Sequence, residues 1–183
     1  FLHGGGFQQG GSDRPEFDPK SFVEKDVILI TVNYRLGALG FLVSINDSIN
    51  GNFGLTDQRL ALTFISNTVK YFGGDPNRIT LFGESAGAVC IAMHLMMEGS
   101  GTNLFQRAIL QSIPMGYKFR DIAVSDFIGK SLMNSLECED VSCLRGERVE
   151  EILHAQENLM GVPRSVGDFF TWGPTMTSRE KGR

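Results

Sequence analysis

The stretch RITLFGESAGAVC, residues 78–90, decides how the rest of this sequence is interpreted. A short apolar run typical of a β-strand leads into a serine between two glycines, and small residues typical of a helix follow. Such a turn has to bend so sharply that the serine takes strained backbone angles and its hydroxyl rises above the sheet. Strand and helix then run so close together that only glycine fits at Gly83 and Gly87. Ser85 is therefore predicted to be a nucleophile. The alternative is an N-cap serine at the start of an ordinary helix.

Strand-like and helix-like segments alternate around this stretch. VILITVNY, residues 27–34, predicts a buried strand of the parallel kind. A helical period begins near Gly54 and ends before the breaker GGDP. Its apolar face is predicted to carry Leu60, Ala61, Phe64, Ile65 and Val69. RAILQ, residues 107–111, predicts a further strand. The alternation predicts an α/β fold built around a mostly parallel sheet.

The bulk composition narrows the class of protein. With 183 residues, 42% of them hydrophobic and 21% charged, the chain matches an ordinary globular domain. A net charge of −4 without any basic run argues against a nucleic-acid or anionic-membrane surface. No apolar stretch reaches the roughly 18 residues of a membrane span. The chain opens on Phe1 and stops at TSREKGR without completing an element, so we interpret it as a fragment of a longer chain.

A glycine-rich loop supplies the second half of a hydrolytic site. Attack by a serine on an ester carbonyl creates an oxyanion, which needs preorganised N–H donors. HGGGF, residues 3–7, offers backbone N–H groups without side-chain obstruction and follows a short apolar segment. The donors expected are the amides of Gly5, Gly6 and Ala86. The alternative is a flexible glycine loop, since QQGGS continues it.

Five motifs together resemble one family. HGGGF, VNYRLGALGFL, GNFGLTDQRLAL, FGGDPNRITLFGESAGA and LFQRAILQS, in this order, resemble the type-B carboxylesterase and cholinesterase family of α/β-hydrolases. The resemblance covers residues 1 to about 112, and SLECEDVSCLRGERVEEIL more loosely. It implies an α/β-hydrolase fold, a mostly parallel twisted sheet with flanking helices. Residues 1–183 would then form a single partial domain of that fold, truncated at both ends.

The resemblance also implies a chemistry and its residues. Family members hydrolyse carboxylic esters through an acyl-enzyme, without a metal or organic cofactor. By position, Ser85 would be the nucleophile, and Gly5, Gly6 and Ala86 would form the oxyanion hole. Glu84 matches a position that lines the site, and we expect it to give electrostatic support only. The substrate expected is a small-molecule or lipid-like carboxylic ester.

The base and the acid are harder to assign. The histidines are His3, His94 and His154. His3 is expected to brace the glycine loop. His94 follows Ser85 by nine residues, about 13 Å along a helix, which is too far for a hydrogen bond and indicates a packing residue. His154 is expected at or near the surface.

Hydrolases of this fold place the triad in the order serine, acid, histidine. Asp168 and Glu180 could be offered as the acid, but no histidine follows either of them. The resemblance implies that acid and histidine lie beyond residue 183. We therefore expect the 183-residue chain to be inactive as it stands.

The cysteines bear on the compartment. Cys138 and Cys143 fall where the family often carries a small disulfide loop, which implies an extracellular location or the lumen of the secretory pathway. The alternative is two unrelated thiols in a cytosolic enzyme. Asn46-Asp47-Ser48 is a glycosylation sequon on a predicted loop, and it points weakly in the same direction.

Two other functions compete with the esterase. One is a catalytically inactive, cholinesterase-like adhesion or binding module, although such proteins have usually lost the serine that this chain keeps. The other is the shorter lipase group that also carries HGGG and G-x-S-x-G, which lacks the NYRLGALGFL and GLTDQRLAL blocks. The sequence does not indicate the acyl or alcohol specificity or the oligomeric state.

Overall fold

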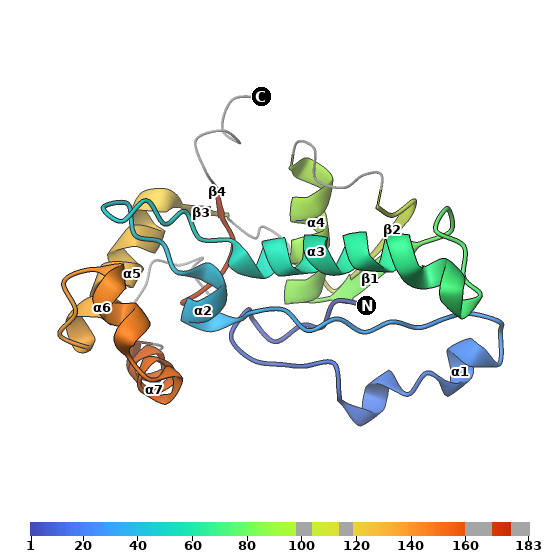
Figure 1. The fold of residues 1–183 in the computed structure, drawn as a ribbon, viewed down its shortest axis with the longest axis horizontal. Coiled ribbons are helices and arrows are strands. Elements are labelled where there is room, and N and C mark those ends of the chain that lie inside the picture. Colours follow the sequence, from blue (N-terminus) through green and yellow to red (C-terminus); the bar gives the residue numbers. More distant parts are fainter. Residues whose placement is uncertain (98–103, 114–118, 160–169, 177–183) are drawn as a thin grey trace. The chain divides into compact units, whose positions relative to one another are not determined.

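The computed structural model describes residues 1–97, 104–113, 119–159 and 170–176, which form two compact units (Figure 1). Unit 1 comprises residues 1–34 and 55–115. Its elements are η1 (Pro15–Phe17), α1 (Lys20–Val23), most of α3 (Phe53–Thr68), η2 (Val69–Phe72), β1 (Thr80–Glu84), α4 (Ala86–Met96) and β2 (Arg107–Gln111).

Unit 2 comprises residues 35–54 and 116–183. Its elements are α2 (Gly37–Phe41), β3 (Arg120–Asp121), α5 (Ile122–Ser135), α6 (Val141–Gly146), α7 (Val149–Leu159) and β4 (Thr175–Met176). No helix in the described ranges is both long enough and apolar enough to cross a bilayer.

The strands of unit 1 run parallel, as predicted. β1 pairs with β2 along its whole length, from Thr80 opposite Arg107 to Glu84 opposite Gln111. Leu2 adds one parallel bridge to Gly83 and another to Val32, so the first residues of the chain lie between β1 and the segment before Tyr34. α4 packs against both β1 and β2. This arrangement confirms the predicted α/β layering around a parallel sheet.

The predicted strand over residues 27–34 is only partly present. The Val32 N–H donates to the Phe1 carbonyl at 3.2 Å, and the Phe1 amino group donates to the Ile30 carbonyl at 2.7 Å. Val27 and Ile28 are 46% and 45% exposed, so their predicted burial is wrong. In the described chain, Ile30 and Val32 contact Phe1 and Leu2, whereas the Val27 N–H donates to the Phe22 carbonyl at 3.0 Å.

α3 begins where the sequence predicts a helix, but only part of the predicted face is buried: Val69 is buried, whereas Ala61 and Ile65 are half-buried. Leu60 and Phe64, predicted to face the core, are 70% and 63% exposed. The residues that α3 and η2 do bury are Gly54, Leu55, Gln58, Leu62 and Val69. These follow a helical spacing, but one of them is polar, and an apolar pattern does not assign a glutamine to a core.

Gln58 can be buried because its side-chain oxygen forms a hydrogen bond with His94. His94 Nε2 lies 2.8 Å from Gln58 Oε1, and both side chains are 0% exposed. The prediction that His94 is a packing residue of α4 is therefore confirmed. Burial lowers the pKa of His94 to about 4, and the positive charge of Arg59 acts in the same direction. The imidazole therefore stays neutral in the folded chain near pH 7.

Unit 2 is held by helix packing and by a few buried polar contacts. α7 packs against α5 and α2, and β3 pairs in parallel with β4. Gln156 Oε1 accepts the N–H of Ala38 at 2.8 Å. Asp126 on α5 accepts the N–H of Ile45 at 2.7 Å and forms an ion pair with Lys130 at 2.7 Å. Burial would raise the pKa of Asp126, but the Ile45 and Lys130 contacts outweigh it, so the pKa lies below its ordinary value.

We expect His94 to make the protein acid-sensitive. A histidine with a lowered folded-state pKa stabilises the fold fully above its unfolded pKa of about 6.5, and this stability is lost as the pH falls towards 4. Between pH 7 and pH 5 the loss is about 2 kcal/mol. Urea unfolding of a His94→Gln variant should therefore vary less with pH than wild type, by about that amount. The exposed His154→Gln variant should keep the wild-type dependence, and identical pH profiles for all three proteins would contradict the argument.

We expect Asp126 to stabilise the fold more through its hydrogen bond with the Ile45 N–H than through its ion pair with Lys130. Asp126→Ala leaves the Ile45 N–H without its charged acceptor and should lower the free energy of unfolding by about 2 kcal/mol. Lys130→Met removes only a half-exposed partner and should cost less than about 1 kcal/mol. Equilibrium denaturation of both variants checks this, and equal effects would show that the ion pair is the main contribution.

Candidate active site

Ser85 occupies the single residue between β1 and α4. Its backbone has φ 52° and ψ −117°, a left-handed conformation that is strained for any residue other than glycine. Two hydrogen bonds hold it there: its N–H donates to the Gln111 carbonyl at 3.0 Å, and its carbonyl accepts the Val89 N–H at 3.0 Å. The side chain is half-buried. The strained turn predicted for GESAG is therefore present.

The glycines that flank Ser85 are required by close backbone approach. A Cβ added to Gly83 would lie 2.8 Å from the Leu2 carbonyl oxygen and 2.9 Å from the Gly87 carbonyl carbon. A Cβ added to Gly87 would lie 2.1 Å from the same Leu2 oxygen. Both contacts are shorter than real Cβ atoms make, and backbone cannot easily move aside. The structure thus gives the reason why only glycine fits at these two positions.

The glycine loop that follows Leu2 lies directly against Ser85. A Cβ on Gly4 would come within 3.2 Å of the Ser85 Cβ. Gly5 and Gly6 have φ values of 115° and 63°, which glycine adopts without strain. Within the described part of the chain, the N–H groups of Gly5, Gly6 and Ala86 donate to no protein acceptor. The glycine loop and the first turn of α4 therefore carry three N–H donors that no described protein group uses.

His3 and Tyr34 brace this loop. The Tyr34 hydroxyl donates to the His3 carbonyl at 2.6 Å, and the two rings stack with centroids 4.5 Å apart. His3 Nδ1 lies 2.8 Å from the Gly4 carbonyl and so acts as a donor there. Burial lowers the pKa of His3, with Arg14 adding to the effect and the Gly4 contact opposing it. The predicted bracing role of His3 is confirmed. Tyr34 was missed, because its only signal is a place inside the quoted VNYRLGALGFL block.

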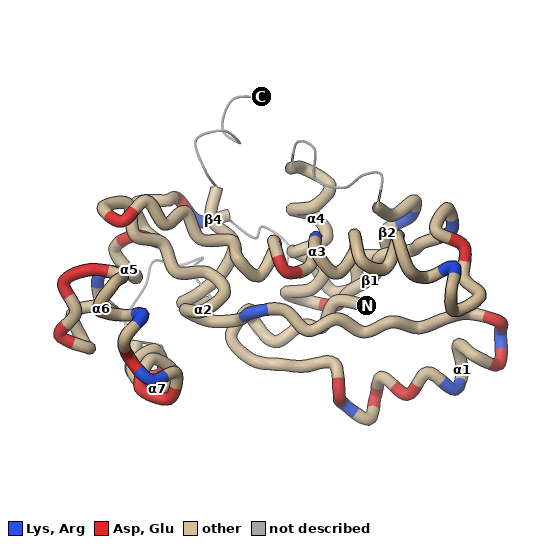
Figure 2. Tube along the Cα trace, viewed as in Figure 1, with Lys and Arg blue, Asp and Glu red and all other residues tan. Residues whose placement is uncertain are grey.

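Glu84 ends β1 beside the loop. Its Oε2 atom would lie 2.6 Å from a Cβ on Gly4, which places the carboxylate next to the glycine loop. α4 carries none of the four charged residue types and is tan throughout in Figure 2, so Glu84 is the charge adjacent in sequence to the serine. The side chain is exposed.

The histidines do not complete a triad among the described residues. His94 is engaged with Gln58, His3 is engaged with Gly4, and the exposed His154 belongs to α7 of unit 2. Within the described ranges, none of them hydrogen-bonds to Ser85. The two candidate acids, Asp168 and Glu180, lie outside the described residues.

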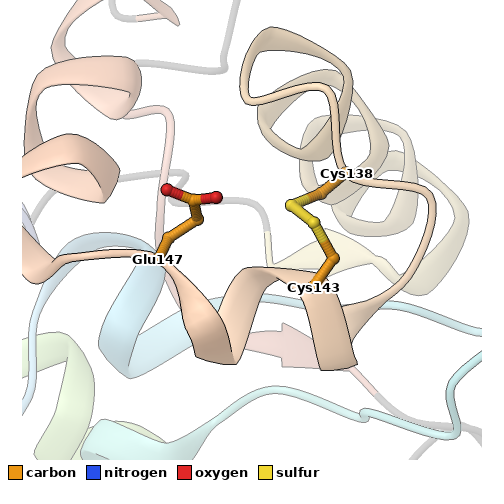
Figure 3. Close-up of side chains that lie close together, drawn as sticks. All are labelled: Cys138, Cys143 and Glu147. Carbon is orange, nitrogen blue, oxygen red and sulfur yellow. A yellow bond between two sulfur atoms is a disulfide. The ribbon is translucent and has the colours of Figure 1, made fainter.

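The predicted disulfide is present in unit 2. Cys138 and Cys143 are joined with an S–S distance of 2.02 Å, and Glu147 lies beside them (Figure 3). Asp140 caps α6 inside the loop by accepting the Cys143 N–H at 2.8 Å. A disulfide offers no thiolate, so this grouping of two cysteines and a glutamate does not have the donors of a metal site. Cys90, also in the described part of the chain, is a free thiol buried in α4.

Comparison with known proteins places the chain in a family. The model of the carboxylesterase family matches residues 1–179. A crystal protein of Dictyostelium discoideum is 41% identical over 96% of this chain and 32% of its own length. A cholinesterase of Mus musculus is 38% identical over 93% of this chain and 31% of its own length. Among solved structures, a thermophilic PNB esterase superimposes with a TM-score of 0.86 at 29% identity, covering 96% of this chain and 37% of its own.

The chain thus spans about a third of the length of these relatives. Its parallel strands, its serine turn and its glycine loop are parts of an α/β-hydrolase fold, as the structural match shows. The chain belongs to the carboxylesterase family.

Proposed function

We propose that this chain carries the nucleophile and the oxyanion hole of a serine carboxylic ester hydrolase. The observation that carries the proposal is the position of Ser85, on a left-handed turn packed against a glycine loop with unused N–H donors. Membership of the carboxylesterase family supports ester hydrolysis as the reaction. The substrate class is a small-molecule or lipid-like carboxylic ester.

The chemistry follows from these groups. The Ser85 hydroxyl adds to the ester carbonyl carbon while its proton passes to a general base. The carbonyl oxygen becomes negative, and the amides of Gly5, Gly6 and Ala86 donate hydrogen bonds to it. The C–O bond to the alcohol breaks, and the alcohol leaves with the proton that the base returns. Water then attacks the acyl-serine by the same route and regenerates the hydroxyl.

The base and acid are not among the histidines described above. His94 and His3 are held by Gln58 and Gly4, and their pKa values are lowered by burial, so neither is suited to accept a proton from Ser85. We infer that the 183-residue chain alone turns over no ester and that the full-length protein supplies both groups. Glu84 would add a negative charge near the site, which favours a cationic imidazole in the transition state.

The Cys138–Cys143 disulfide supports an oxidising compartment, which is the extracellular space or the lumen of the secretory pathway. The competing function, a binding module without catalysis, is an outcome of the first experiment below.

Replacing the nucleophile tests the reaction directly. In the full-length protein, Ser85→Ala should abolish labelling by a fluorophosphonate and lower kcat/KM for a p-nitrophenyl ester by at least about 10³-fold. Ser131→Ala, a half-buried serine of α5 in unit 2, should leave both unchanged. Wild-type protein that takes up no label and hydrolyses no ester would instead favour the binding module.

Replacing Tyr34 tests the brace. Tyr34→Phe keeps the ring that stacks on His3 but removes the hydroxyl that donates to the His3 carbonyl. The loop should then hold its N–H donors less firmly, so we expect kcat to fall about tenfold, or roughly 1.4 kcal/mol, with KM little changed.

The matched control is Tyr71→Phe, because that side chain is 76% exposed and should be neutral. A Tyr34→Phe enzyme with wild-type kcat would show that the hydroxyl serves stability alone. Steady-state kinetics and thermal unfolding, measured on the same samples, separate the two roles.

A further inference from the structure

The sequon Asn46-Asp47-Ser48 forms the tip of a tight turn in unit 2. Ser44 and Ile49 exchange two backbone hydrogen bonds, at 3.0 and 2.8 Å, and so close a hairpin-like loop. Inside it, the Ser48 N–H donates to the Ile45 carbonyl at 3.1 Å, which makes residues 45–48 a β-turn. Asn46 and Ser48 are both exposed at this tip.

The turn is anchored by groups other than the two that a glycosyl transfer would need. Ser44 Oγ donates to Asp47 Oδ2 at 2.5 Å, and the Ile45 N–H donates to Asp126 at 2.7 Å. Within the described residues, neither the Asn46 side-chain amide nor the Ser48 hydroxyl makes a hydrogen bond to the protein. A sugar attached to Asn46 would therefore break no contact that holds the turn.

There is also room for the sugar. Asn46 lines an open hollow of about 510 Å³ together with the end of α5 and the start of the disulfide loop. Its other walls include Lys130, Asn134 and Glu139, whose side chains are polar and compatible with a hydrated carbohydrate.

We propose that Asn46 is N-glycosylated. The Asn46 amide nitrogen bonds to C1 of the first sugar of a lipid-linked oligosaccharide. The pyrophosphate-linked lipid leaves with the electron pair of the bond that breaks, and the amide loses one proton. The proposal rests on the secretory location proposed above, which the disulfide in the same unit supports independently. It does not rest on ester hydrolysis.

The test uses the full-length protein secreted from cells that make it. Treatment with peptide N-glycosidase should increase its gel mobility and convert Asn46 to aspartate in the peptide that spans residues 36–59. Before any enzyme treatment, Asn46→Gln and Ser48→Ala should each run ahead of wild type by the mass of one glycan. Ser48→Thr keeps the sequon and should stay glycosylated, as should Asn50→Gln, which changes a neighbouring asparagine outside the sequon.

The result that overturns the proposal is an unmodified Asn46 in protein whose Cys138–Cys143 bond has formed. Ester turnover is measured on the same preparation and tests the proposed reaction independently of glycosylation. An unglycosylated but active enzyme would refute only this inference, and a glycosylated but inactive protein would refute only the proposed reaction.

Discussion

The carbonyl oxygen of Leu2 passes so close to Gly87 that not even a methyl group fits between them, and this contact fixes the relation between the serine and the glycine loop. The Leu2 N–H donates to Phe82 in β1, so the first strand segment is locked in register with the strand that delivers Ser85. The loop that leaves Leu2 must then cross the start of α4. Because the constraint is made of backbone, no side-chain rearrangement can relax it, and the glycine loop stays beside Ser85.

The sequence predicted those parts of the fold that depend on short-range chemistry. The turn at Ser85 and the glycines around it are dictated by residues within a few positions of one another, and the structure has them as expected. The face of α3 could not be predicted in the same way. Its apolar pattern pointed to Leu60 and Phe64, whereas the buried stripe includes Gln58, whose side chain forms a hydrogen bond with His94 of another helix. Likewise, of the strand predicted over residues 27–34, only Ile30 and Val32 pair with Phe1 and Leu2.

At the candidate site, too, the features set by neighbouring residues could be predicted, and the contacts between distant residues could not. Ser85 and its flanking glycines are visible as a motif, and the small disulfide loop could be inferred from the family resemblance. Tyr34 could not be found, because its hydroxyl bonds to a backbone carbonyl thirty-one residues away, and a backbone acceptor leaves no mark in the sequence. The role of His3 was accessible only because it opens the glycine loop itself.

One feature of unit 1 bears on how this polypeptide behaves in water. Leu60, Phe64 and Tyr71 follow one another four and seven residues apart, and each exposes more than three-fifths of its surface. Exposed apolar side chains of this kind favour self-association, or burial against another surface, because either removes apolar area from water. The isolated 183-residue polypeptide is therefore expected to self-associate in solution. Whether it stays monodisperse will depend on what covers these three side chains.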